Sequence, residues 1–357
     1  MCTTPPGGDK PPWIEEIREC ATTLHPVVRS PLDLIPTMGR DLERLESQLE
    51  ESVQTQDPFL TEVASHLIRA GGKRVRPGFV IASAAISQNQ PVPAADDVLT
   101  GGVAVELVHL GSLYHDDVMD EAQVRRNVAS VNAKWGNLRA ILAGDFLLAR
   151  ASELAASLGT EVAGLLAATI GRLCEGQVRE LQDTGNPDRT ETSYIDSIDG
   201  KTASLLATSC RIGGLVAGLD RSTVDTLTEF GRYYGLAFQV VDDILDIVAT
   251  DEHLGKPSGN DLHEGIYTLP VIRALRSDCG PQLLELLGGT VSDATVRSAL
   301  QLVRASGGVE EALDVASDYV KQASTSLESL PPTTATAALQ VATDHLIDRA
   351  RIPLGDR

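Results

Sequence analysis

Aromatic residues, cysteines and long hydrophobic runs are all scarce in this sequence of 357 residues. Phe, Trp and Tyr make up 4% of the chain, and Ala, Leu and Val dominate its apolar residues, which favours helices over strands. The five cysteines are scattered without metal-binding spacing, which predicts reduced thiols in a cytoplasmic protein. No signal peptide and no run of about 18 uncharged apolar residues is visible, so we expect no membrane span.

Positive charge is scarce as well. The chain carries 30 Lys and Arg against 50 Asp and Glu, a formal net charge of −20. Such a surface repels nucleic acid and anionic lipid, so we expect no nucleic-acid partner. Because basic residues are few, the places where they cluster carry more information.

Helical periodicity dominates the chain from residue 31 onward, and no strand alternation or domain linker is visible. Breaks carry Gly, Asn or Pro, as at 71–72, 185–187 and 331–332. The sequence therefore predicts an all-α fold, a single large helical bundle over residues 31–357, preceded by a flexible tail over residues 1–30. The predicted helices cover residues 39–54, 59–70, 75–88, 98–120, 137–156, 160–182, 192–218, 222–249, 268–278, 294–305, 308–329 and 335–350.

Two five-residue carboxylate clusters of the same form, Asp-Asp-x-x-Asp, occupy residues 116–120 and 242–246. With 28 Asp in the chain, chance predicts about 0.2 such clusters, so a pair is unexpected. On a helix the first and fifth positions share one face, where carboxylates repel one another unless cations compensate. Mg²⁺ prefers such oxygen ligands and commonly shares them with substrate phosphates. The alternative is two solvated acidic helix faces.

Basic residues stand close to both clusters. A glycine turn, three basic residues and a proline follow one another over residues 71–77, a pattern typical of anion binding at a helix N-terminus. Arg125 and Arg126 follow the first cluster, while Lys201 and Lys256 flank the second. Solvated surface charge would explain each one alone. Together they indicate a diphosphate held by Mg²⁺ and a second anion held by basic side chains.

With these motifs in this order, the sequence resembles the trans-isoprenyl diphosphate synthases from about residue 65 to residue 275. The resemblance implies a bundle of the isoprenoid synthase type with a central cavity, a homodimer, and Mg²⁺-assisted prenyl transfer from an allylic diphosphate to isopentenyl diphosphate. The motifs that carry it are Gly71–Pro77, Glu106–Asp120, Arg125–Arg126, Ala143–Asp145, Gly200–Thr202, Phe238–Asp246, Gly255–Asp261 and Thr268–Pro270.

The resemblance also implies a role for each motif residue. The expected ligands of a trinuclear Mg²⁺ cluster are Asp116, Asp120 and Asp242. The aspartates expected to support them are Asp117, Asp243 and Asp246. The allylic diphosphate would be bound by Arg125, Lys201, Thr202, Gln239 and Lys256. Isopentenyl diphosphate would be bound without metal by Lys73, Arg76, His109 and Arg126. For His109 the alternative is a satisfied core histidine.

One position departs from the family pattern. Ile266 stands two residues before Thr268, where a lysine is common, so one cation of the allylic site is expected to be missing. Two other functions share the fold. A class I terpene cyclase and a non-catalytic regulatory subunit would each be expected to lack one of the strict aspartate clusters, so the presence of both argues against them.

Product length is predicted from the helix that carries Asp116. Short-chain synthases of this family place aromatic bulk four or five residues before that aspartate, where this chain has Ser112 and Gly111. Val108, one turn further back, is also small. The open wall predicts a long-chain product, of the hexaprenyl-to-decaprenyl class. The alternative is a geranylgeranyl or farnesyl product, if a residue of another helix closes the cavity sooner.

Overall fold

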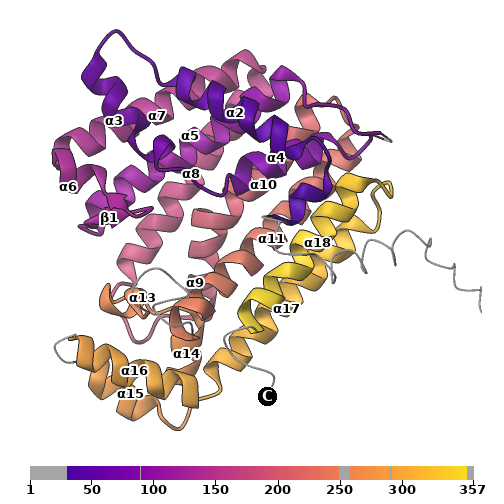
Figure 1. Ribbon diagram of the computed structural model, residues 1–357. Helices are drawn as coiled ribbons and strands as arrows, with labels where there is room; N and C mark the ends of the chain where they lie inside the picture. Colours follow the sequence, from indigo (N-terminus) through magenta and orange to yellow (C-terminus); the bar gives the residue numbers. More distant parts are fainter. Residues whose placement is uncertain (1–29, 89, 249–257, 289–291, 352–357) are drawn as a thin grey trace, which may run out of the picture.

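A computed structural model describes residues 30–88, 90–248, 258–288 and 292–351, and helices make up most of these segments (Figure 1). The predicted tail, except for Ser30, lies outside the described residues. The first half of the chain contains η1 (Pro31–Leu34), α2 (Met38–Ser52), α3 (Pro58–Arg69), α4 (Val75–Ala84), α5 (Asp96–Met119), β1 (Val124–Arg125), β2 (Val128–Ala129), α6 (Val131–Trp135), α7 (Asn137–Ser157) and α8 (Thr160–Gln182).

The second half continues the bundle. It contains α9 (Glu191–Ile198), η2 (Asp199–Ala203), α10 (Ser204–Val216), α11 (Arg221–Val248), α13 (Asn260–His263), α14 (Leu269–Leu275), α15 (Gly280–Leu287), α16 (Asp293–Ala305), α17 (Gly308–Leu327) and α18 (Thr334–Arg351). In Figure 1, α2 to α7 form the upper part of the molecule and α13 to α16 its lower end, with α11, α17 and α18 running between them.

The centre of the bundle is α5, which is surrounded by other helices. Its residues 101–108 are buried without interruption, a pattern that a helix with one solvent-facing side cannot have. It packs against α7, α4, α10 and α2. This position brings the half-buried Asp116 and the buried Asp117, near the C-terminal end of α5, into the interior, whereas Asp120 at the C-cap is exposed.

Helix ends follow the local chemistry of the sequence. Asp57 caps α3 by accepting the N–H groups of Phe59 and Leu60 at 2.9 and 3.3 Å, and Pro58 opens the helix. The predicted breaks at 71–72, 185–187 and 331–332 all lie between helices. Among the described residues, no helix has both the length and the apolar character of a membrane span.

The predicted helix over residues 192–218 is interrupted by the π-helical turn η2. Here α8 and η2 approach closely, because Gly176 and Gly200 face each other. A Cβ atom on Gly176 would lie 2.6 Å from the backbone nitrogen of Lys201, and one on Gly200 would lie 2.8 Å from the Arg172 carbonyl oxygen. The crossing brings the side chain of Lys201 next to α8.

The prediction of no strand is wrong for one hairpin. Strands β1 and β2 pair antiparallel, and the turn between them consists of Arg126 and Asn127, at φ 53° and 62°. Two residues per strand are too few to produce a visible alternation, and the turn lacks the usual glycine. The hairpin follows the first aspartate cluster and carries two of the predicted cationic site residues.

Candidate active site

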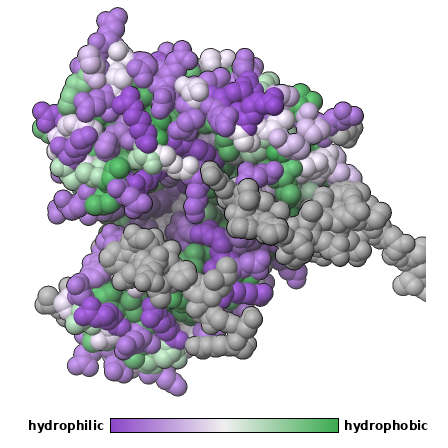
Figure 2. All heavy atoms as spheres, viewed as in Figure 1, coloured by the Kyte–Doolittle hydropathy of each residue, from purple (hydrophilic) through white to green (hydrophobic). Residues whose placement is uncertain are grey.

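The helices enclose two adjoining cavities, of about 830 and 730 Å³. The larger one, here called the polar cavity, has Asp120, Glu180, Asp243 and Asp261 in its wall. The smaller one, here called the apolar cavity, is lined largely by Val108, Leu113, Leu148, Ile170, Leu173 and Leu205. Both share Asp116, Arg125, Lys201, Thr202 and Gln239. Figure 2 shows a hollow with hydrophilic side chains between the upper part of the molecule and its lower end.

The aspartates of the first cluster point in two directions. Asp116 and Asp120 line the polar cavity, and neither side chain forms a hydrogen bond or ion pair with another residue in the described part of the chain. Asp117 is buried, and its Oδ1 accepts Nε and Nη2 of Arg125, each at 2.6 Å. Arg125, predicted to bind the allylic diphosphate, thus also anchors the hairpin to α5.

The electrostatics at Asp116 fit a cation. Burial raises the pKa of Asp116 to about 6, and the neighbouring Asp120, whose own pKa is also raised by burial, adds repulsion. In the described segments no three His, Cys, Asp or Glu side chains converge as a ready-made metal site. An ion held here must therefore complete its coordination with water or diphosphate oxygens, as Mg²⁺ commonly does.

In the second cluster, Asp243 is buried at the centre of a hydrogen-bond network. It accepts the hydroxyl of Tyr194 at 2.6 Å and Nε2 of Gln239 at 2.7 Å. Thr202 in turn donates to Oε1 of Gln239 at 2.7 Å. Burial raises the pKa of Asp243 to about 7, although both hydrogen bonds oppose the shift. Thr202 and Gln239, predicted to contact the allylic diphosphate, lie in both cavity walls and also hold Asp243.

The other two aspartates of this cluster differ in exposure. Asp242 lines the apolar cavity and accepts Nη2 of Arg349, from α18, at 3.3 Å. The guanidinium carbon of Arg349 also lies 5.8 Å from the ring centre of Phe238. Asp246 is buried, and its Oδ2 accepts the N–H of Asp261 at 3.3 Å, which ties the end of α11 to α13. Asp242 thus faces the apolar cavity, whereas Asp243 lies in the wall of the polar cavity.

Lys201 lies between the two clusters. Its Nζ donates to Oε1 of Glu180 at 2.6 Å. Burial lowers the pKa of Lys201, but Glu180 and Asp116 outweigh that effect, so the net pKa lies above its ordinary value. Lys201 is therefore a charged residue beside Asp116, in the wall that both cavities share.

The residues predicted to bind isopentenyl diphosphate fall into two groups. Arg76 and His109 line the apolar cavity and Arg126 lines the polar one. Nε of Arg76 is buried without a hydrogen-bond partner among the described residues. Burial, followed by the charges of Arg76 and Arg126, lowers the pKa of His109 well below 6.5, so this side chain is neutral at pH 7. Lys73 is exposed and outside both cavity linings, and Lys256 lies outside the described residues.

One of the three predicted chain-length positions needs correction. Val108 and Ser112 line the apolar cavity, but Gly111 does not. A Cβ atom on Gly111 would lie 3.1 Å from the carbonyl oxygen of Gly144 and 3.2 Å from Leu148, so this glycine permits close packing of α5 on α7. The sequence could not distinguish the side of α5 that lines the cavity from the side that packs on α7, because the middle of this helix is buried all round.

Three site residues had no role in the sequence analysis. They are Glu180, Tyr194 and Arg349, which contact Lys201, Asp243 and Asp242 respectively. No local sequence signal marks them, because these contacts join residues that are 21, 49 and 107 positions apart. Ile266, the departure from the family pattern, does line the polar cavity, so an apolar side chain stands among its charges.

Comparison with known proteins finds extensive similarity to one family. Residues 57–303 match the model of the polyprenyl synthetase family. Nonaprenyl diphosphate synthase of Mycobacterium tuberculosis is 43% identical over 310 residues, which cover 86% of this chain and 91% of that protein. A decaprenyl diphosphate synthase structure from Rhodobacter capsulatus superposes with a TM-score of 0.82 at 30% identity, covering 89% of this chain and 99% of the other.

A second solved structure bears on the ligands. It is geranylgeranyl pyrophosphate synthase from Corynebacterium glutamicum complexed with calcium and isoprenyl diphosphate, with a TM-score of 0.77 and 38% identity over 89% of this chain and 98% of that chain. That structure thus holds calcium and isoprenyl diphosphate together. Given the extent of these matches and the two aspartate clusters at adjoining cavities, the chain belongs to the polyprenyl synthetase family and is a prenyltransferase.

Proposed function

We propose that this enzyme condenses isopentenyl diphosphate with an allylic diphosphate and extends the product to a long-chain all-trans polyprenyl diphosphate. The observation that carries the proposal is the apolar cavity, which begins at Asp116 and runs along α5 past Ser112 and Val108. Its wall on α5 has no Phe, Tyr or Trp side chain, so a growing hydrocarbon chain can occupy it while the diphosphate stays at the aspartates. The relatives named for nonaprenyl and decaprenyl products support this length.

Mg²⁺ ions, expected as a cluster of three, would be held by Asp116, Asp120 and Asp242. When bound, they neutralise the diphosphate and stabilise the negative charge that develops on it as the allylic C–O bond breaks. Asp116 and Asp120 suit this role because both line the polar cavity and neither forms a hydrogen bond or ion pair with another described residue.

The cationic side chains would divide the two substrates between them. Lys201 and Arg125 lie in the walls of both cavities, where they would hold the allylic diphosphate. Arg76, Arg126 and neutral His109 would hold isopentenyl diphosphate, with the exposed Lys73 reaching it from the loop. The apolar lining excludes water from the allylic cation, so that the isopentenyl double bond attacks it instead. The released diphosphate then accepts the proton lost from the product.

A geranylgeranyl-length product is the second candidate, since the relative from Corynebacterium glutamicum has that name. The bulky side chains of Leu148, Ile170 and Leu205 could close the cavity from the helices opposite α5. Purified enzyme with isopentenyl diphosphate, farnesyl diphosphate and Mg²⁺ decides the matter. Products of thirty or more carbons by mass spectrometry support the proposal, whereas an enzyme that stops at twenty carbons refutes the long-chain assignment.

We also propose a homodimer formed across α7 and α8. Their outer face carries exposed apolar side chains, with exposed fractions of 79% for Leu138, 65% for Leu142, 52% for Val178 and 50% for Leu181. A neighbouring set of apolar side chains this exposed is typical of an interface. Val178 and Leu181 also line the apolar cavity, so a second copy seated here would cover its side.

Light scattering after size exclusion tests the homodimer. Leu142→Asp should convert a dimer to monomers, because it places a charge in the contact. Leu284→Asp is the matched control, since Leu284 is exposed on α15, away from this face. A wild-type protein that is monomeric at micromolar concentration would refute the interface.

A further inference from the structure

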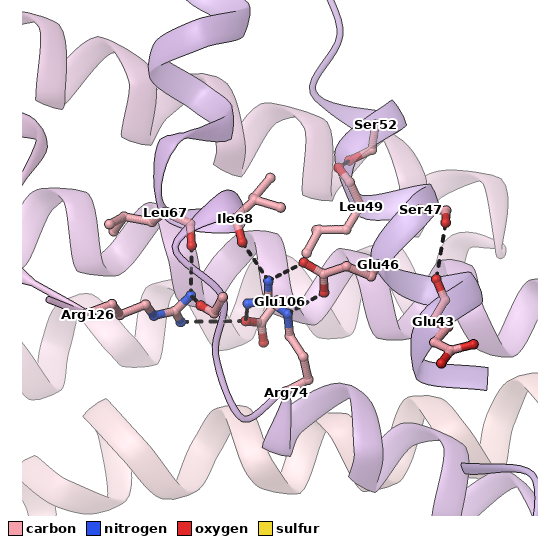
Figure 3. A network of polar contacts seen from close by, with 11 residues as sticks. Glu43, Glu46, Ser47, Leu49, Ser52, Leu67, Ile68, Arg74, Glu106 and Arg126 are labelled. Atoms are coloured by element: carbon pink, nitrogen blue, oxygen red, sulfur yellow. Dashed lines mark hydrogen bonds and ion pairs between the residues drawn. The ribbon is translucent and has the colours of Figure 1, made fainter. Parts of the chain in front are cut away.

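A buried ion-pair network lies behind the proposed isopentenyl diphosphate site (Figure 3). The sequence pattern grouped Arg74 with the anion-binding cations of residues 71–77, but its side chain is only 6% exposed and turns away from the cavities. Its Nε and Nη2 donate to the two carboxylate oxygens of Glu46 at 2.7 and 2.6 Å, and Nη1 donates to Glu106 at 2.9 Å. Arg74 is therefore a structural cation between two glutamates.

This network holds the start of α4 in an unfavourable backbone conformation. Arg74 has φ 46° and ψ 40°, a left-handed geometry that residues with a side chain rarely adopt. Its Nη2 also donates to the carbonyl oxygen of Ile68 at 3.1 Å. The contacts join α2, the end of α3 and α5 to a residue that stands two positions before Arg76.

Glu106 faces a second arginine of the site. Its Oε1 lies 3.8 Å from Nη2 of Arg126, whose Nη1 donates to the carbonyl oxygens of Leu67, at 3.0 Å, and Gly71. Gly72 packs between the two guanidinium groups, since a Cβ atom there would lie 3.0 Å from both Arg74 and Arg126. Glu106, 2% exposed, is thus the shared carboxylate of the two arginines that enclose the glycine turn.

We propose that Glu106 is a positioning residue for isopentenyl diphosphate: it orients Arg126 directly, and it orients Arg76 through Arg74 and the glycine turn. The inference rests on the proposed function. It predicts a change in affinity opposite in sign to the change that the charge of Glu106 alone would cause. A carboxylate near an anion site repels the anion, so if its charge alone mattered, neutralising Glu106 would tighten binding. If Glu106 positions the arginines, the same change weakens binding.

Calorimetric titration of isopentenyl diphosphate in EDTA measures whether the dissociation constant rises or falls, and no turnover occurs during the measurement. We expect Glu106→Gln to raise Kd, and the KM for isopentenyl diphosphate, about tenfold, with kcat and the allylic KM within about threefold of wild type. Glu43→Gln makes the same charge change on α2, one turn before Glu46, where Figure 3 shows the carboxylate pointing away from the network. This control should bind as wild type does. Unchanged or tighter binding by Glu106→Gln overturns the inference.

Two further comparisons keep the test decisive. If Glu106→Gln does not fold by circular dichroism, the half-exposed Glu46→Gln takes its place, with an expected rise in Kd of about threefold because Arg74 loses its bidentate partner. No rise there overturns the inference equally. Failure of the wild-type protein to bind isopentenyl diphosphate or to form product would instead refute the proposed function.

Discussion

Product length should respond to bulk placed on successive turns of α5. Ser112 and Val108 both line the apolar cavity, four and eight residues before Asp116. At 1.5 Å per residue they lie about 6 and 12 Å from Asp116 along the helix axis, and an isoprene unit spans about 4–5 Å. The two positions thus lie about one isoprene unit apart along α5, so Ser112→Phe should shorten the product relative to wild type, and Val108→Phe should give a product about one unit longer than that of Ser112→Phe.

The assay is mass spectrometry of products made from farnesyl diphosphate and labelled isopentenyl diphosphate under excess substrate. Ser112→Ala is the matched control, since it changes the same side chain without adding bulk, and its products should be those of wild type. The structure adds a contrast at Gly111, where a phenylalanine would meet Gly144 and Leu148 of α7. Gly111→Phe should thus lower the unfolding temperature. If Ser112→Phe and Val108→Phe gave products of equal length, or wild-type length, the cavity would not be the path of the growing chain.

Three further outcomes are expected. Asp116→Ala or Asp242→Ala should reduce kcat/KM on the order of 10³-fold or more. EDTA should abolish diphosphate release, and near-wild-type turnover in EDTA would refute metal binding at these aspartates. Arg76→Ala should mainly raise the KM for isopentenyl diphosphate, and Lys201→Ala should mainly raise the KM for the allylic substrate. Steady-state kinetics showing the reverse would mean that the two substrates are assigned to the wrong residues. His109 has a pKa lowered well below 6.5, so below pH 6.5 the unfolded chain binds a proton that the folded protein does not, and stability falls. Wild type should therefore lose about 1.4 kcal/mol more than His109→Gln between pH 7.5 and 5.5 in urea denaturation, and equal losses would contradict the assignment of a neutral histidine.

The long helices could be predicted from the sequence because each buries a periodic apolar face. The range 308–329 became α17, Gly308–Leu327, and 160–182 matched α8 without a shift. The elements that escaped prediction are short. Helix α13 has four residues and α6 has five, too few for a period of 3.6 to repeat. Their conformation depends on contacts with the rest of the bundle rather than on their own sequence.

The candidate site was only partly predictable, because its polar contacts join distant segments. Arg349 reaches Asp242 across 107 residues, and Tyr194 reaches Asp243 across 49. Nothing local distinguishes Arg349 from the other basic residues of the chain. Arg74 illustrates the opposite error, since it stands among basic residues that are proposed to bind an anion while its own partners are Glu46 and Glu106.

The pairing of adjacent aspartates in each cluster has a structural reason. Successive residues on a helix point about 100° apart, so the two aspartates of each pair have different surroundings. Asp116 and Asp242 line the apolar cavity, whereas Asp117 lies outside both cavity linings and Asp243 lies in the wall of the polar cavity. Asp117 anchors Arg125 and the β1–β2 hairpin, and Asp243 anchors Tyr194 and Gln239. The second aspartate of each cluster thus attaches a neighbouring element to the helix end that carries the cavity-facing carboxylate. Replacing it by a residue that cannot accept these bonds would displace the site even though Asp116 and Asp242 are kept.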